Sequence, residues 1–441
     1  MHINISRDLD VRRQVDVFVA GSGPAGLAAA LAAAAQGRSV FLAEGHSCFG
    51  GMGTAGLMPL FMHFGDGVNF YATGIGRKVY DMMYERGATS SPPGCMTPII
   101  KAERLKRLYD DLVTASGIGF GLMTNLVGVE TAGPRVTHAV CWGKSGLFAV
   151  EAKAFVDCTG DGDLAAWAGA PFEKGDEQGR LMPGTLCSLW ANVDWEKVWA
   201  GRKPGGNDED KLPEAIAAGV FTTPDLHLPG MFPTGKGLGG GNIGHLFGID
   251  GTDERSLTES LLWGRKSLEE YEHFYKGYYT GFEQMELVAT GSLPGVRESR
   301  RIRGDYVLCL DDFNSRASFD DEVGRYSYPV DIHAASFGVE DQAQAREEFL
   351  NLRYQPGESY GIPYRSLVPQ GLDNVLVAGR CLSADRGVQS SIRVMPDCFI
   401  TGQAAGVAAA MVAQEAISAR QVEVAQLQQR LRALDTISPD S

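Results

Sequence analysis

A short apolar run near the start of the chain leads into a glycine-rich segment and then into a stretch of almost pure alanine and leucine. The run is Val17–Val19, the segment Gly21–Gly26 reads Gly-Ser-Gly-Pro-Ala-Gly, and Ala28–Ala35 is small and apolar on every face. A second short run, Ser39–Leu42, follows after Gly37. This order predicts a strand, a tight turn, a helix thin enough to lie close to a sheet, and a second strand.

The three glycines have the spacing of a dinucleotide-binding turn. Gly21 permits the tight turn, Gly23 lets backbone approach a pyrophosphate, and Gly26 lets the helix pack closely on the strand. The first N–H groups of the helix then face the phosphates, aided by the helix dipole. Glu44 lies where a carboxylate would accept a hydrogen bond from a ribose hydroxyl. We therefore predict a dinucleotide site, against the alternative of a glycine-rich turn in another α/β protein. Its contacts would be Gly21, Gly23, Pro24, Ala25, Gly26 and Glu44.

Hydrophobic spacing predicts further elements along the chain. Helices are expected at Val79–Arg86, Lys101–Ala115, Ser256–Thr280, Thr401–Ala413 and Gln426–Leu434, and strands at Phe120–Glu130, Arg135–Trp142 and Asn374–Ala378. The last helix carries Leu427, Leu431 and Leu434 on one face. That face indicates packing against the protein itself or, alternatively, a contact in a homo-oligomer.

Composition narrows the class of protein. Of the 441 residues, 44% are hydrophobic and 21% charged, so a large core is available. The net charge of −14 argues against nucleic acid or an anionic membrane surface as a partner. No apolar run approaches the roughly 18 residues of a membrane span, and the N-terminal segment is too polar and acidic for a signal peptide. The eight cysteines form no CxxC pair, so we expect no metal site and a cytoplasmic protein with reduced thiols.

Three further segments follow the first glycine turn in a familiar order. Gly50–Thr54 supplies Gly-Gly-x-x-Thr, Thr159–Asp163 reads Thr-Gly-Asp-Gly-Asp, and Gly379–Pro396 combines Gly-Arg with Arg-Val-Met-Pro. With these motifs the chain resembles, over nearly its whole length, the FAD-dependent oxidoreductases related to fumarate reductase and glutathione reductase.

The resemblance implies an α/β fold: a Rossmann-like FAD-binding domain of the glutathione-reductase type, in three layers, with an inserted α+β substrate domain. Residues 1–184 and 361–441 would form the FAD-binding domain and residues 185–360 the insertion. It also implies FAD as the cofactor, with further contacts from Gly50, Gly51, Thr54, Val127, Thr159, Gly160, Asp161, Gly379, Arg380, Ile392, Arg393 and Val394. Asp161 and Asp163 could instead be simple helix N-caps.

Candidate catalytic residues come from the middle of the chain. Four arginines, the first being Arg297, fall within seven residues. They form either a solvated basic face or, through Arg297 and Arg301, part of the catalytic cavity. His333 ends a Pro-x-Asp-Ile-His segment that is similar to one near the flavin in family members, which implies a catalytic role. His63 and His245 are weaker candidates, because a lone histidine is more often structural.

Together these features predict an enzyme that oxidises a small polar substrate by hydride transfer to FAD from a C–H bond beside an alcohol or amine. There is one dinucleotide fingerprint and not two, so electrons would enter from the substrate and leave to oxygen, a quinone or another acceptor. His333 would act as the general base. Arg393 or Arg297 would hold a carboxylate or polarise an oxygen.

Two other functions fit the same sequence. One is a fumarate-reductase-like reduction of a C=C bond, with an arginine as proton donor. The other is a flavin-carrying subunit without substrate chemistry of its own. Covalent attachment of FAD through His46 or Cys48 is a further option, against the simpler expectation that both side chains only pack or cap.

Overall fold

The computed structural model of this chain describes residues 7–202 and 207–434. Its largest sheet has seven strands. Five are parallel, in the order β3 (Gly119–Gly121), β2 (Val40–Ala43), β1 (Val11–Ala20), β6 (Gly146–Asp157) and β15 (Val375–Val377). Beside β6, β5 (Arg135–Gly143) and β4 (Asn125–Ala132) continue the sheet in antiparallel fashion. The predicted α/β class and the Rossmann-like parallel sheet are therefore confirmed.

β6 is the strand at which the sheet branches. One edge pairs with β1 along residues 149–157, whereas the other pairs with β5 over residues 146–151 and with β15 over residues 155–157. Its 12 residues thus connect the antiparallel strands to the parallel ones. The carboxyl end of β6 is the parallel part, and it leads into the predicted Thr159–Asp163 turn.

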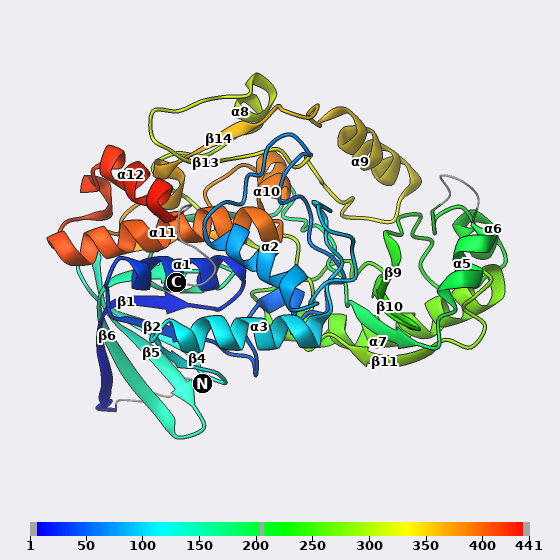
Figure 1. Ribbon diagram of the computed structural model, residues 1–441, viewed down its shortest axis with the longest axis horizontal. Coiled ribbons are helices and arrows are strands. Elements are labelled where there is room, and N and C mark those ends of the chain that lie inside the picture. Colours follow the sequence, from blue (N-terminus) through cyan, green and yellow to red (C-terminus); the bar gives the residue numbers. More distant parts are fainter. Residues whose placement is uncertain (1–6, 203–206, 435–441) are drawn as a thin grey trace.

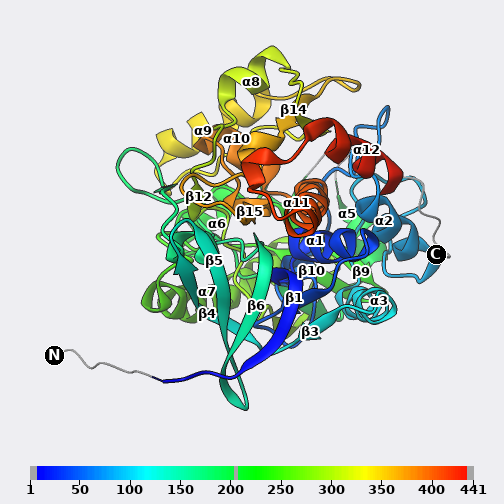
Figure 2. The ribbon, with the colours of Figure 1, turned by 90° about the vertical axis from the view of Figure 1, so that its left-hand side faces the viewer.

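Two helices of small residues, α1 (Pro24–Ala35) and α11 (Met395–Glu415), lie side by side over one face of the sheet (Figure 2). A Cβ atom at Gly402 would lie 2.2 Å from the carbonyl oxygen of Ala25, and one at Gly406 would lie 2.2 Å from that of Ala29. Nothing larger than hydrogen fits at these two points. Nearly all residues of both helices are buried, as expected for helices that are apolar all round.

Three amphipathic helices cover the outside of this α/β unit: α2 (Ile75–Glu85), α3 (Ala102–Ala115) and α12 (Val424–Leu434) (Figure 1). Leu105, Leu108 and Leu112 of α3 are buried, as their spacing predicts. The three leucines predicted on one face of the last helix are buried as well, so that face packs against the protein itself. Among the described residues, no helix combines the length and the apolarity needed to cross a membrane.

A second, antiparallel sheet lies at the other end of the molecule (Figure 1). Its order is β11 (Glu286–Thr290), β8 (Ser188–Ala191), β10 (Leu238–Asn242) and β9 (Gly230–Gly235). α5 (Trp195–Gly201), α6 (Leu212–Ala217) and α7 (Glu254–Tyr278) complete this part, whose core includes Trp190, Phe274 and Phe282. These elements fall within residues 185–360, where the α+β insertion is predicted.

The rest of that segment is tied to the α/β unit. β12 (Arg300–Ile302) pairs with β7 (Phe172–Lys174), and β13 (Glu322–Tyr326) pairs with β14 (Tyr360–Pro363). The boundaries predicted after residues 184 and 360 therefore run between or through paired strands, and the domain division stays a prediction. The remaining elements are α4 (Asp163–Trp167), α8 (Leu310–Ser315), α9 (Val339–Asn351), α10 (Arg386–Ile392) and the 3-10 turns at Gly51–Gly53, Tyr364–Leu367, Gly379–Cys381 and Ala419–Gln421.

Gly406→Ala should destabilise the fold, because the added methyl group collides with α1 and must push the two helices apart. Overpacking of this kind lowers the free energy of unfolding by about 1–3 kcal/mol, which thermal melting of the purified variant would measure. The matched control is Gly277→Ala in α7, where nothing lies within 4 Å of an added Cβ. It should raise stability by up to about 1 kcal/mol, because alanine is the better helix former. Equal melting temperatures for the two variants would contradict the close helix contact.

Candidate functional site

One cavity of about 880 Å³ is lined both by the predicted dinucleotide turn and by the predicted catalytic side chains. Its wall includes Gly21–Ala25 and Glu44 from the first βαβ unit, and Arg297, His333 and Arg393 from distant parts of the chain. Ligand cavities in proteins span about 300–1,000 Å³, so this one is near the upper end. The predicted cofactor and catalytic residues therefore share one site.

The glycine turn has the geometry that its spacing predicts. Gly21 has a φ of +83°, and a Cβ there would lie 2.6 Å from the carbonyl oxygen of Cys158. A Cβ at Gly26 would lie 1.8 Å from the oxygen of Gly21, whereas nothing lies within 4 Å of a Cβ at Gly23. α1 begins at Pro24 without a side-chain cap. Its first N–H groups and the positive end of its dipole are therefore available to an anion in the cavity.

Glu44 is held in place at the end of β2. Its buried carboxylate accepts hydrogen bonds from the backbone N–H and the hydroxyl of Ser22, at 2.8 and 2.5 Å, and from the N–H of His46 at 2.7 Å. These donors join the acid to the glycine turn itself. The carboxylate that is predicted to bind a ribose hydroxyl is thus fixed beside the turn that is predicted to bind the pyrophosphate.

The Thr159–Asp163 turn is built on a buried acid, Asp157. Its carboxylate accepts from the N–H and the hydroxyl of Thr159, at 3.1 and 2.7 Å, and from the N–H of Ala165 at 2.8 Å. Burial raises the pKa of Asp157 to about 6. Thr159 and Gly160 line the cavity next to the first glycine turn, because β6 and β1 are neighbours in the sheet.

The two other acids of this turn form ion pairs. Asp161 Oδ1 lies 2.9 Å from Arg380 Nη2, and Asp163 Oδ1 lies 2.6 Å from Arg300 Nη1. The alternative interpretation as helix N-caps is wrong, since the N-cap of α4 is Gly162. Thr159 Oγ1 and Asp157 accept from the first N–H groups of the helix instead. Asp161 therefore holds Arg380, which itself lines the cavity.

Most residues predicted to bind FAD belong to the cavity wall: Gly21, Gly23, Pro24, Ala25, Glu44, Gly51, Thr159, Gly160, Gly379, Arg380, Arg393 and Val394. The wall does not include Gly26, Gly50, Thr54, Val127, Asp161 and Ile392. Thr54 is fully buried, and its hydroxyl donates to the carbonyl of Phe49 at 2.5 Å, so it shapes the loop. Val127 is 46% exposed, while its neighbour Leu126 lines the cavity.

His333 lies in the cavity wall together with two other histidines, His227 and His245. His245 Nε2 is 3.0 Å from His333 Nδ1. His245 Nδ1 is 2.9 Å from Asp225 Oδ2, although the two are not aligned as a hydrogen bond, and His333 Nε2 is 3.5 Å from Asp331 Oδ1. Burial lowers the pKa of all three histidines, that of His227 to about 4 with the help of the neighbouring His245. The three imidazoles are therefore neutral near pH 7.

His227 is not among the catalytic residues predicted from the sequence, and His245 is predicted only as a weak candidate. A signal was present, because Asp225-Leu226-His227 repeats the Asp-x-His pattern of Asp331-Ile332-His333. His63, the other weak candidate, lies outside the cavity wall with its ring against Tyr328. His46 lines the cavity and Cys48 is buried nearby in sequence; burial raises the pKa of the Cys48 thiol.

Arg297 and Arg393 differ in what they bind. Arg393 Nη2 lies 3.1 Å from both a side-chain and the backbone oxygen of Asp331. Arg297 is buried, donates through Nη1 to the carbonyl of Pro183 at 2.7 Å, and forms no ion pair with any described residue. Burial, reinforced by the charge of Arg393, lowers the pKa of Arg297 to about 10, so the group is still a cation at neutral pH.

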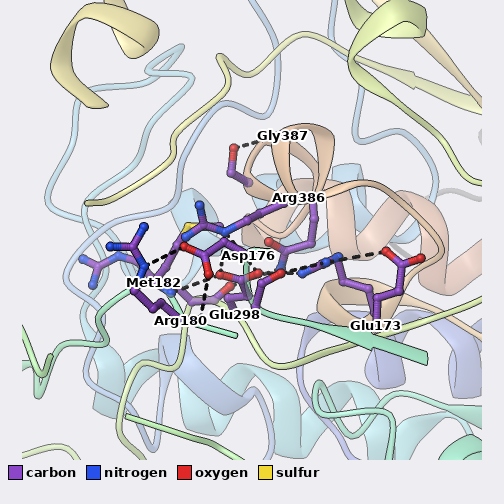
Figure 3. Close-up of polar contacts among 12 residues, drawn as sticks. Glu173, Asp176, Arg180, Met182, Glu298, Arg386 and Gly387 are labelled. Atoms are coloured by element: carbon purple, nitrogen blue, oxygen red, sulfur yellow. Dashed lines mark hydrogen bonds and ion pairs between the residues drawn. The ribbon is translucent and has the colours of Figure 1, made fainter. Parts of the chain in front are cut away.

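A buried acid fixes the segment that carries Arg297. Figure 3 shows Glu298 between the backbone of Met182 and the side chain of Arg386, at 3.0 Å from each. Glu298 also accepts from Arg301 at 2.5 Å, and it is fully buried. The interpretation of the arginine run as a solvated face is therefore wrong: Arg297 reaches the cavity, and Arg301 is a structural partner of Glu298.

These residues fit the FAD that the motifs imply. The open space at Gly23 admits a phosphate group, α1 directs its positive end at that space, and Glu44 is fixed where an acid would meet a ribose. α11 also begins at the cavity, where Val394 and Met395 are part of the wall. The site thus places two helix N-termini, and not one, against an anionic cofactor.

Gly23→Ala should weaken FAD binding without unfolding the protein, since its methyl group meets open cavity and no protein atom. We expect the Kd for FAD to rise by at least roughly tenfold, about 1.4 kcal/mol, in a fluorescence titration of the FAD-free protein. Gly26→Ala is the matched control: its methyl group collides with the turn and should lower the melting temperature even without FAD. Unchanged FAD affinity of Gly23→Ala would contradict this mode of binding.

Glu298→Gln keeps the shape of the side chain but leaves the buried Arg301 and the partly buried Arg386 without their shared anion. Removing one partner of a buried pair destabilises by about 3–5 kcal/mol, which should appear as a large drop in melting temperature. The control is Glu214→Gln, because Glu214 forms an exposed surface pair with Lys211 and such pairs contribute little. A melting temperature equal to that of the control would show that the network is dispensable.

The chain is similar in fold to several solved structures. A geranylgeranyl bacteriochlorophyll reductase-like protein from Thermoplasma acidophilum is 13% identical, with 97% of this chain and 89% of that chain covered and a TM-score of 0.47. The flavin-dependent brominase Bmp2 is 12% identical (96% and 83%, TM-score 0.48), and p-nitrophenol 4-monooxygenase from Pseudomonas putida DLL-E4 is 10% identical (97% and 91%, TM-score 0.45). Sequence identities of 10–13% and TM-scores of 0.45–0.48 carry no argument about the reaction of this chain. Among curated proteins none matches the chain significantly.

The family comparison covers nearly the whole chain. Residues 16–431 match the family described as FAD dependent oxidoreductase, and this range contains every motif and every cavity residue described above. The protein is therefore a member of the FAD-dependent oxidoreductase family, an enzyme with FAD as its cofactor.

Proposed function

We propose that the enzyme oxidises a small alcohol or amine that carries an anionic group, such as a hydroxy acid or an amino acid. The observation that supports this best is Arg297, a buried guanidinium in the wall of the FAD cavity without an ion-pair partner among the described residues. When bound, FAD supplies the hydride acceptor, taking two electrons with the hydrogen of the C–H bond and passing them on to oxygen, a quinone or another acceptor.

Arg297 favours an anionic substrate for an energetic reason. Buried charges in proteins are normally paired, because leaving water without a partner is costly. Among the described residues, only the Pro183 carbonyl accepts a hydrogen bond from this guanidinium, through Nη1. The planar fork of an arginine matches a carboxylate in bidentate fashion. Arg393 is less suited to this role, since Asp331 already neutralises it.

The heteroatom of the substrate would face the three histidines, which share the cavity wall with Arg297. This atom must lose a proton when the neighbouring carbon loses its hydride, so that an alcohol becomes a carbonyl compound and an amine becomes an imine. His333 is not an isolated base, because His245 lies 3.0 Å from one of its nitrogens and Asp331 lies 3.5 Å from the other. The proposal therefore assigns the heteroatom to the histidine cluster as a whole.

A fumarate-reductase-like reduction of a C=C bond is the second candidate. The observation that favours it is again Arg297, whose pKa of about 10 makes it a stronger acid than an ordinary arginine and a possible proton donor to carbon. This reaction needs an external reductant and an unsaturated acid as substrate.

Arg297→Met should abolish the preference for acids. In anaerobic stopped-flow experiments on the FAD-bound protein, pools of hydroxy acids or amino acids should bleach the flavin absorbance of the wild type, and uncharged polyols should not. The variant should keep its FAD but lose roughly 100-fold or more in the second-order rate of bleaching, about 2.7 kcal/mol. Arg297→Lys, which keeps the charge and loses the fork, should fall between the two.

Two results would speak against this function. Bleaching by uncharged polyols that Arg297→Met does not slow would remove the anionic group from the proposal. A flavin that no pool bleaches, but that an unsaturated acid re-oxidises after chemical reduction, would favour the C=C reductase instead.

A further inference from the structure

Three imidazole side chains from three separate loops meet in the wall of the cavity. His227 lies between α6 and β9, His245 between β10 and α7, and His333 between β13 and α9. One nitrogen of each lies within 4.8 Å of the others. We propose that these three histidines bind one divalent transition-metal ion of the zinc type.

The nitrogens that face one another have the spacing of ligands. His245 Nε2 and His333 Nδ1 are 3.0 Å apart, and two imidazole ligands on a tetrahedral Zn²⁺, each at about 2.0–2.1 Å, are about 3.3 Å apart. His227 Nε2 is buried and has no hydrogen-bond partner. One nitrogen of His227 lies within 4.8 Å of the other two ligand atoms, so a small movement of its side chain would complete the set.

A carboxylate stands behind each imidazole, on the nitrogen that points away from the cluster. In metal sites such outer acids fix the ring orientation and the tautomer, so that the inner nitrogen offers its lone pair to the ion. The pairs are His245 Nδ1 with Asp225 at 2.9 Å, His333 Nε2 with Asp331 at 3.5 Å and His227 Nδ1 with Glu209 at 3.5 Å.

The charge and the ligand set favour a catalytic type of site. The three imidazoles offer the nitrogen ligands that zinc takes in proteins, and the three neighbouring carboxylates favour a cation at the centre. Three protein ligands with a fourth position open to a cavity are typical of catalytic zinc, whereas structural zinc is closed by four. All three histidines line the cavity, so the fourth position faces the space for the substrate.

The ion would act on the substrate heteroatom, and this role rests on the function proposed above. A 2-hydroxy acid could place its carboxylate on Arg297 and its hydroxyl oxygen on the ion. The positive charge lowers the pKa of the bound hydroxyl, whose proton leaves to water in the cavity. The two electrons leave with the hydride of the adjacent C–H bond, for which bound FAD would be the acceptor. The ion therefore keeps its oxidation state, and the product is a 2-oxo acid.

The sequence predicts no metal here, because the ligands are far apart in the chain and lack any local spacing. His245 and His333 are separated by 88 residues, and neither shows the i, i+4 or CxxC patterns by which zinc sites are recognised. Only the fold brings the two Asp-x-His segments to the same point.

The test is the metal content of the FAD-bound protein. After incubation with Zn²⁺ and gel filtration in metal-free buffer, plasma mass spectrometry should find about one zinc ion per chain in the wild type. His227→Ala and His245→Ala should each keep about a tenth or less of that amount while retaining FAD. His227→Ala should also keep its melting temperature, whereas His245→Ala should melt lower because its side chain is buried. His273→Ala is the matched control, because His273 is exposed on α7, away from the cluster; it should bind zinc as the wild type does.

Wild-type protein without zinc, or His227→Ala with as much zinc as the wild type, would overturn the proposal. Should the histidine variants fail to fold, zinc-edge X-ray absorption of the wild type decides, since three imidazole ligands support the site and sulfur or purely oxygen ligands overturn it. Zinc content does not depend on turnover. A zinc-containing protein that no acid pool bleaches would thus support the metal site and remove only the proposed oxidation.

Discussion

The architecture depends on how closely α1 approaches its neighbours. On one side, Gly402 and Gly406 leave room for hydrogen alone between α11 and the backbone of α1. At its N-terminal end, Gly21 and Gly26 bring the helix onto the ends of β1 and β6 in the same way. Because the backbones are in direct contact at both places, the helices cannot shift against their neighbours. The N-termini of α1 and α11 are therefore fixed at the same cavity. Two converging helix dipoles then create a positive potential where an anionic cofactor is to bind.

In the part of the cavity proposed for the substrate, the arrangement of side chains depends on the pairing of buried charges. Glu298 neutralises Arg301 and Arg386, and Asp331 neutralises Arg393. Arg297 is left as a cation without an ion-pair partner among the described residues, in the same cavity wall as imidazoles that burial keeps neutral. A fold that pairs its other nearby arginines and leaves one unpaired in a cavity has a place for an external anion. The cofactor part of the cavity is therefore built from closely packed helix ends, and the substrate part from charged and imidazole side chains.

Local pattern was enough to predict the first of these parts. The glycine spacing, the alanine-rich helix and Glu44 lie in one short segment, and the structure places them as predicted. The leucines of the last helix, which lie elsewhere, are predicted in the same way from their spacing. The histidine cluster could not be predicted in this way, because it forms only when three loops meet, and the loop of His333 is 88 or more residues away from the other two. Likewise, whether Arg297 faced water or the cavity depended on the neighbouring buried acid Glu298, which fixes this segment through Met182, Arg301 and Arg386. The sequence shows Glu298 only as one more acid.

We propose that a single cavity holds FAD at the glycine turn and an anionic substrate between Arg297 and the histidines. A crystal structure of the FAD complex soaked with a small 2-hydroxy acid tests it most directly. We expect the pyrophosphate of FAD at the N-terminus of α1. The carboxylate of the acid should lie on the Arg297 guanidinium, with its hydroxyl toward His227, His245 and His333. An FAD that lies away from the glycine turn, or an acid bound outside this cavity while Arg297 stays without a partner, would contradict it.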